Sequence, residues 1–124
     1  MIADYRNRHQ GESMLVCGTG PSLLDVPKNP PIASIGVNMC HEWVHTDYLV
    51  ILGNMHAHRT PERRRIINNS TPKAFFIKRG GDEKEWGDYW KTNKLPAAES
   101  TIVPFAYDFP WGKPIRDRKS TRLN

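Results

Sequence analysis

The sequence has little cysteine and no long hydrophobic run. Its 124 residues include two cysteines, Cys17 and Cys40, which exclude a disulfide framework and favour a reducing compartment. The longest aliphatic run, Leu49–Leu52, is far shorter than the ~20 residues that a membrane-spanning helix needs. The polar N-terminal region lacks the apolar core of a signal peptide. We therefore expect one cytoplasmic domain with no membrane span.

Basic residues are concentrated at the C-terminal end. Four of the 18 lysines and arginines fall within residues 116–124 beside one aspartate, so this segment carries most of the net charge of +5. No basic stripe with interleaved aromatics occurs elsewhere, which argues against specific nucleic-acid binding. We predict a domain over residues 1–115 and a disordered basic tail over 116–124. The string RKSTRLN resembles translated adapter sequence, so we hypothesise that the native frame is lost near Arg116 and that the domain is incomplete.

Short apolar segments alternate with polar connections along the chain. Five such segments predict strands, at residues 14–18, 32–38, 47–53, 73–78 and 100–105. This alternation is typical of an α/β protein with a Rossmann-like open, mostly parallel sheet.

Two of the connections carry further signals. Thr60 and Pro61 predict the start of a helix whose Ile66 and Ile67 face the sheet. Residues 79–100 are polar and glycine-bearing, and we expect a long lid-like excursion with one short helix. The aromatic residues of this excursion either stack on a base or sugar, or anchor it through a local hydrophobic patch; they are Trp86, Tyr89 and Trp90.

A glycine-rich loop follows the first predicted strand. Gly18 and Gly20 permit a tight turn, and Pro21 suits the first position of a following helix. Such a loop presents backbone N–H groups that hold phosphates, although the same spacing also occurs in plain turns. Polar residues after the second and third strands would lie at the same edge of the sheet. The predicted ligand-binding residues are Gly18, Thr19, Gly20, Pro21, Ser22, Asn38 and Asn54.

Three segments, RNRHQGESMLVCGTGPSLLDVP, SIGVN and TDYLVILG, resemble bacterial and phage proteins of two related kinds. They are similar to MptE-like 6-hydroxymethylpterin diphosphokinases and to bacterial sialyltransferases that use CMP-sialic acid. The resemblance implies a Rossmann-like transferase in which the glycine loop and the asparagines hold a nucleotide or nucleotide-sugar donor, with Mg²⁺ as a further candidate cofactor. Two departures bear on catalysis. Thr19 replaces a loop asparagine of the sialyltransferases, and Gly53 replaces an aspartate of many MptE-like relatives. No catalytic residue can be assigned.

His41, Glu42 and His45 spell the H-E-x-x-H motif of zinc peptidases. Zincins carry this motif on a long helix, whereas here only residues 39–46 separate two predicted strands. We therefore predict no metal ligands and a short connecting helix instead, in which Trp43 and Val44 pack inward and both histidines are partly exposed.

Three further groups have alternative interpretations. His56 and His58 are either rim residues near a nucleotide or exposed loop residues, and the arginines at 63–65 either meet phosphates or form a solvated helix face. For the chain as a whole, the leading interpretation is a nucleotide-binding transferase domain. The alternatives are a non-catalytic, degenerate or phage-encoded binding module of the same fold, and a zinc hydrolase.

Overall fold

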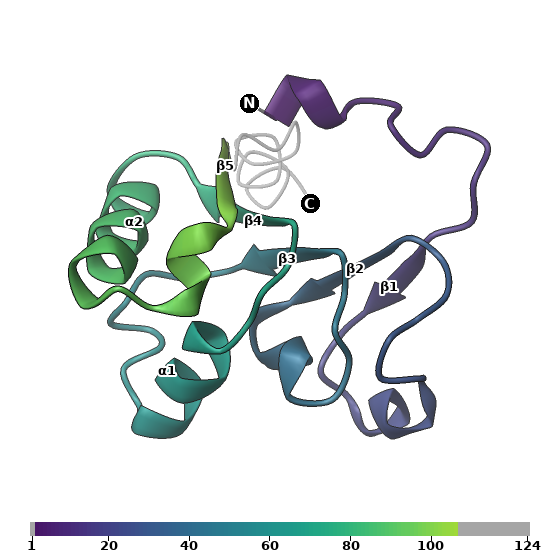
Figure 1. Cartoon of the computed structure of the whole chain (residues 1–124), viewed down its shortest axis with the longest axis horizontal. Helices are drawn as coiled ribbons and strands as arrows, with labels where there is room; N and C mark the ends of the chain where they lie inside the picture. Colours follow the sequence, from purple (N-terminus) through teal and green to yellow (C-terminus); the bar gives the residue numbers. More distant parts are fainter. Residues whose placement is uncertain (1, 107–124) are drawn as a thin grey trace, which may run out of the picture.

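A parallel five-stranded sheet forms the centre of the molecule (Figure 1). The structure is a computed structural model and describes residues 2–106. Each strand pairs with the next one along the chain, so the order in the sheet is β1-β2-β3-β4-β5. The predicted α/β class with an open parallel sheet is confirmed, and each of the five predicted strands is present. The strands are β1 (Leu15–Cys17), β2 (Ser34–Val37), β3 (Tyr48–Ile51), β4 (Ala74–Lys78) and β5 (Thr101–Phe105).

The helical elements that connect the strands gather on one side of the sheet (Figure 1). Two are α-helices, and the others are short 3-10 turns of four or five residues. In sheet order the connections are η2 (Pro21–Asp25), η3 (Asn38–Glu42), α1 (Pro61–Asn68), and α2 (Gly81–Asn93) with η4 (Pro96–Glu99).

The side of the sheet that carries these elements holds the main core. Alternate residues of β3 and β4 project to it, among them the fully buried Leu49 and Phe75. Trp90 of α2 stacks obliquely on Phe75 at a ring-centroid distance of 4.6 Å, and Trp86 lies 5.2 Å from Trp90. Large buried aromatic rings of this kind contribute a major share of the hydrophobic free energy of folding.

The two long connections form helices for identifiable reasons. Thr60 caps α1 by accepting a hydrogen bond from the Arg63 amide, and Pro61 occupies the first turn as predicted. The predicted lid over 79–100 is wrong. The expected helix is present as the 13-residue α2, because Trp86, Tyr89 and Trp90 are spaced for one helix face. Trp86 and Trp90 are fully buried, so this segment packs onto the core and does not form a lid.

The opposite side of the sheet is covered mainly by the N-terminal turn η1 (Ile2–Tyr5), which lies across the sheet from the other helices (Figure 1). The Tyr5 ring contacts Tyr48 and Phe76 edge-on, at centroid distances of 5.8 and 5.3 Å. His9 fixes the same segment through a 2.8 Å hydrogen bond between its Nε2 and the Tyr48 hydroxyl. Part of this side stays open, since Val16 at the β1 edge is 76% exposed.

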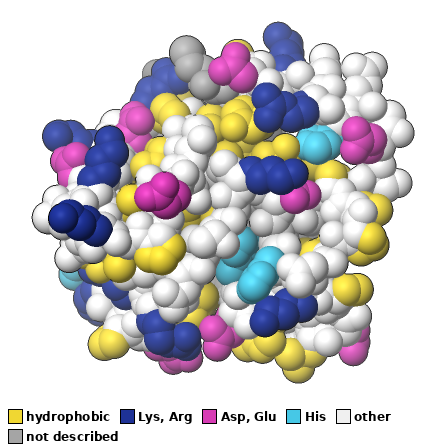
Figure 2. Space-filling view, in the orientation of Figure 1, with side chains coloured by type: hydrophobic (Ala, Val, Ile, Leu, Met, Phe, Trp, Pro, Cys, Tyr) yellow, Lys and Arg dark blue, Asp and Glu magenta, His cyan; other side chains and the backbone are white. Residues whose placement is uncertain are grey.

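A shallow apolar depression of about 300 Å³ lies on the open side, and hydrophobic side chains are visible between basic ones in the upper part of Figure 2. It is lined by Ile2, Ile35, Val50, Phe76 and Phe105.

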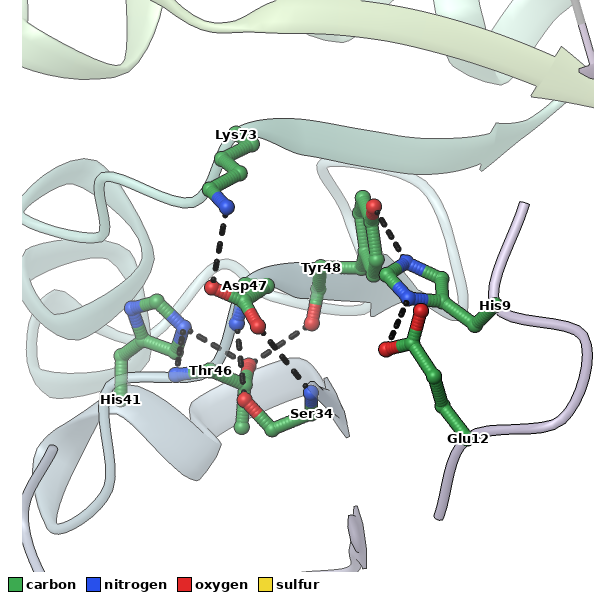
Figure 3. A network of polar contacts seen from close by, with 8 residues as sticks. All are labelled: His9, Glu12, Ser34, His41, Thr46, Asp47, Tyr48 and Lys73. Atoms are coloured by element: carbon green, nitrogen blue, oxygen red, sulfur yellow. Dashed lines mark hydrogen bonds and ion pairs between the residues drawn. The ribbon is translucent and has the colours of Figure 1, made fainter. Parts of the chain in front are cut away.

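A polar network joins the starts of the three strands β2, β3 and β4 (Figure 3). Ser34 and Asp47 bond reciprocally. The Asp47 amide donates to Ser34 Oγ at 3.0 Å, and the Ser34 amide donates to Asp47 Oδ2 at 3.1 Å. Lys73 adds an ion pair to Asp47 at 3.5 Å from the start of β4. These contacts set the relative register of β2, β3 and β4 at the edge where the strands begin. The predictions for Arg116–Asn124, both the disordered tail and the lost reading frame, fall outside the described residues.

Candidate functional site

The five strands run in one direction, so the loops after them lie along one edge of the sheet. The predicted ligand-binding residues lie at this carboxyl edge: residues 18–22 follow β1, Asn38 follows β2, and Asn54 comes three residues after the end of β3. Within an open parallel sheet this is the edge at which ligands bind. The sequential strand order contains no reversal within residues 2–106, so no switch point selects one position along that edge.

Gly18 and Gly20 are glycines that the fold itself does not require. Neither has a positive φ angle, and Gly20 is extended at φ −79° and ψ 172°. A Cβ atom built on either residue would meet no other atom within 4 Å. Backbone conformation and internal packing would therefore accept larger residues here. The open space at both positions would allow a ligand to approach the backbone closely.

The loop presents exposed backbone N–H groups. Thr19 and Gly20 are solvent-exposed, and no acceptor within residues 2–106 takes a hydrogen bond from their amides. Pro21 starts η2 as predicted, but η2 has only five residues and adds little helix dipole. A small cavity of about 80 Å³ adjoins the loop, and its lining includes Cys17, Gly18, Gly20 and Ser22. This space suits a phosphate-sized group and is much smaller than the roughly 300 Å³ or more of most ligand pockets.

Larger depressions lie away from this loop. The one on the open side of the sheet is lined only by hydrocarbon and offers nothing to bind an anion. A shallow groove of about 530 Å³ between α2 and β5 is lined by two acidic side chains, Glu83 and Asp88, and by two lysines, Lys84 and Lys91. Lys84 is paired with Asp88 at 3.0 Å, so the charges of this lining balance and give an anion no net attraction. The amide of Gly80 at the start of α2 already donates to Glu83 Oε1 at 3.0 Å. Chemistry therefore favours the glycine loop as the candidate phosphate site.

Asn38 ties the ends of two neighbouring strands together. Its backbone is left-handed, at φ 50°, a conformation that asparagine tolerates better than most residues. Its Oδ1 accepts a hydrogen bond from the Leu52 amide at 2.8 Å. The carbonyl oxygen of the side chain thus has a structural role, and the NH₂ group is the part of Asn38 that can donate to a ligand.

The loop after β3 is built around Gly53 and Asn54. Gly53 has φ 106°, and a Cβ there would lie 2.9 Å from the Cβ of Ala57. Asn54 Oδ1 accepts from the Ala57 amide at 2.9 Å, so its oxygen closes a turn. An aspartate in place of Gly53 would be strained by both its backbone conformation and this contact, which explains physically why glycine occupies the position.

His58 and Arg64 hold this loop from inside, and no local sequence pattern predicts this role. Of the two alternatives for His58, the exposed loop residue is wrong: His58 is 1% exposed, and its Nε2 donates to the Leu52 carbonyl at 2.7 Å. Its Nδ1 is buried with no hydrogen-bond partner in the described part of the chain. Arg64 donates to the His58 and Met55 carbonyls at 3.0 Å each, so it does not lie on a solvated helix face. His56 is exposed.

The rings of His41 and His45 stack at a centroid distance of 5.5 Å, but the side chains of the H-E-x-x-H motif have separate partners. His41 Nε2 accepts the Thr46 amide at 3.1 Å, and the carboxylate of Glu42 pairs with Arg65 at 3.6 Å. Within residues 2–106, no three His, Cys, Asp or Glu side chains are arranged to hold a metal ion. His41 and Glu42 lie in the 3-10 turn η3, which ends before His45, so the motif does not lie on one helix as it does in a zincin.

Two expectations for this connector are wrong. His41 is buried while His45 is exposed, and Trp43 is 45% exposed while Val44 is buried as expected. Burial of His41, reinforced by nearby His45, lowers its pKa from 6.5 to about 4. Because Nε2 accepts the Thr46 amide, the proton of the neutral ring resides on Nδ1. Neutral His41 is therefore part of the fold.

No helix within residues 2–106 combines the length and hydrophobicity needed to cross a bilayer. Comparison of the chain with protein-family models, with curated proteins and with solved structures found no match.

Proposed function

We propose that this chain is a nucleotide-binding domain of a transferase, which holds the phosphates of an activated nucleotide donor at Gly18–Ser22. The observation that carries the proposal is the pair of exposed glycines that neither backbone strain nor packing requires. Their neighbouring amides have no acceptor in the described chain, and anions bind to such groups. The nucleoside would extend from the loop along the carboxyl edge toward Asn38. Transfer of a glycosyl or diphosphate group rests on the resemblance alone, and so does the participation of Mg²⁺.

Isothermal titration with CMP, UDP, GDP and ATP, each with and without Mg²⁺, tests binding. The site is tested with Gly20→Val, because its side chain would enter space that the protein leaves open. Gly81→Val is the matched control, since Gly81 also has an ordinary φ and an open Cβ position. Binding that is lost in Gly20→Val and retained in Gly81→Val supports the proposal. No binding to the parent protein by any of the four ligands ends it.

A second candidate is a binding module of the same fold without turnover. Gly53 favours it, because the loop conformation there disfavours an aspartate that could serve a metal-bound phosphate. Nucleotide binding without release of product from a CMP-sugar, or without transfer of diphosphate from ATP, would favour the module over the enzyme.

A further inference from the structure

Two cysteines lie next to each other behind the carboxyl edge. Cys17 is the last residue of β1, and Cys40 lies in η3 immediately after β2. Both are buried, with exposed fractions of 4% and 0%. They belong to the same hydrophobic core, on the side of the sheet that carries the helical elements.

Gly36 leaves space beside β1 that the Cys40 thiol occupies. Gly36 is the register partner of Cys17 in the neighbouring strand. A Cβ built on Gly36 would lie 2.7 Å from Cys40 Sγ, so that thiol occupies the place of the missing side chain. Register partners in paired strands project to the same side of the sheet, which directs the Cys17 side chain toward Cys40. Burial raises the pKa of the Cys40 thiol, and the nearby Cys17 thiol raises it further.

We propose that Cys17 and Cys40 form an intramolecular disulfide when the protein meets a small-molecule disulfide such as oxidised glutathione. One cysteine, as thiolate, attacks the S–S bond of the oxidant and releases one glutathione. The second cysteine then attacks the protein sulfur of the mixed disulfide and releases the other glutathione. The two protons lost by the cysteines are taken up by the two released thiolates. Both electrons pass to the oxidant.

The cross-link would connect two segments at the carboxyl edge of the sheet. It would join Cys17, which lines the small cavity at the glycine loop, to the turn η3, which begins at Asn38 on the neighbouring strand end. The reaction is slow in the folded protein, because burial raises the pKa of both thiols, that of Cys40 to about 12, and thiolate is the attacking species. The inference does not depend on nucleotide binding.

The test uses the full chain, reduced and then incubated with oxidised glutathione in a mildly alkaline buffer. Samples are denatured, alkylated and measured by intact mass, and peptides are mapped without reduction. We expect both alkylatable thiols to disappear together, in a monomer whose peptides containing Cys17 and Cys40 are linked. We also expect thermal unfolding to shift upward by roughly 5 °C, because a cross-link that fits the native geometry constrains the unfolded chain.

Cys17→Ser and Cys40→Ser are the controls, and each should give only unreacted protein or a mixed disulfide. Persistence of both thiols in the parent protein would overturn the proposal. So would a product linked only between molecules, or an oxidised form that melts below the reduced one. The experiment measures the number of free thiols and the thermal stability. Neither requires a bound nucleotide, so the test stands even if no nucleotide binds.

Discussion

The side chain of Asn38 bridges two strand ends by accepting the Leu52 amide at 2.8 Å from a left-handed backbone. Both features favour asparagine or aspartate at this position. Replacing Asn38 by alanine should lower the free energy of unfolding by about 1–2 kcal/mol, through loss of the hydrogen bond and strain at positive φ. Urea denaturation measures this. Asn38→Asp, which keeps an acceptor oxygen, should lose less. Equal stability of the parent and Asn38→Ala would contradict the bridging role.

Buried His41 predicts a pH dependence of stability. Its pKa is about 4 in the folded protein and about 6.5 when unfolded, so between these values the unfolded chain binds more protons. Its contribution is fully present above about pH 6.5 and is lost as the pH falls through this window. The loss reaches up to ~3 kcal/mol near pH 4.

Urea denaturation curves measured from about pH 4 to about pH 7 give the free energy of unfolding across the range in which His41 titrates. His41→Gln should flatten this dependence. His56→Gln, at an exposed histidine, should leave it unchanged. If the slope persists in His41→Gln, then another group is its source.

The conformation of Gly53 predicts the cost of placing an aspartate at this position. Gly53→Asp should destabilise the protein by about 2 kcal/mol or more, because φ is 106° and the new Cβ would meet Ala57 at 2.9 Å. The double variant with Ala57→Gly removes the contact while the backbone strain remains, so it should recover only part of the loss. Thermal unfolding compares the three proteins. Full stability of Gly53→Asp would show that the loop rearranges easily.

Variants of Trp90 measure how much the packing of α2 on the core contributes to the free energy of unfolding. Trp90→Ala removes the stacking on Phe75 and should cost about 3–5 kcal/mol. Trp90→Phe keeps a ring and loses the 3.1 Å bond from Nε1 to Asn68 Oδ1, so it should cost about 1 kcal/mol. Chemical denaturation followed by circular dichroism checks both. Similar losses in the two variants would mean that the hydrogen bond dominates the packing.

Local patterns predicted the sheet and α1, because short apolar runs and the Thr60–Pro61 cap act within a few residues of chain. The helical spacing of Trp86, Tyr89 and Trp90 was also present in the sequence. The many polar residues around them led us to expect a lid instead of a helix packed on the core. No local sequence pattern indicates that His41 and His58 are buried. Each buried histidine depends on a partner that folding brings close. The Thr46 amide donates to His41, and the Leu52 carbonyl accepts from His58. At the candidate site, the sequence predicted the glycine loop but not the hydrogen bond that occupies the Asn38 oxygen.

Each strand lies beside its predecessor, and this order has a consequence for biosynthesis. A chain emerging from the ribosome can pair β2 with β1, then β3 with β2, before later segments exist. Parallel sheets usually fold slowly, because their pairings join distant parts of the chain. Here every pairing spans a single connection, so we expect assembly to proceed during translation from the N-terminal strand onward.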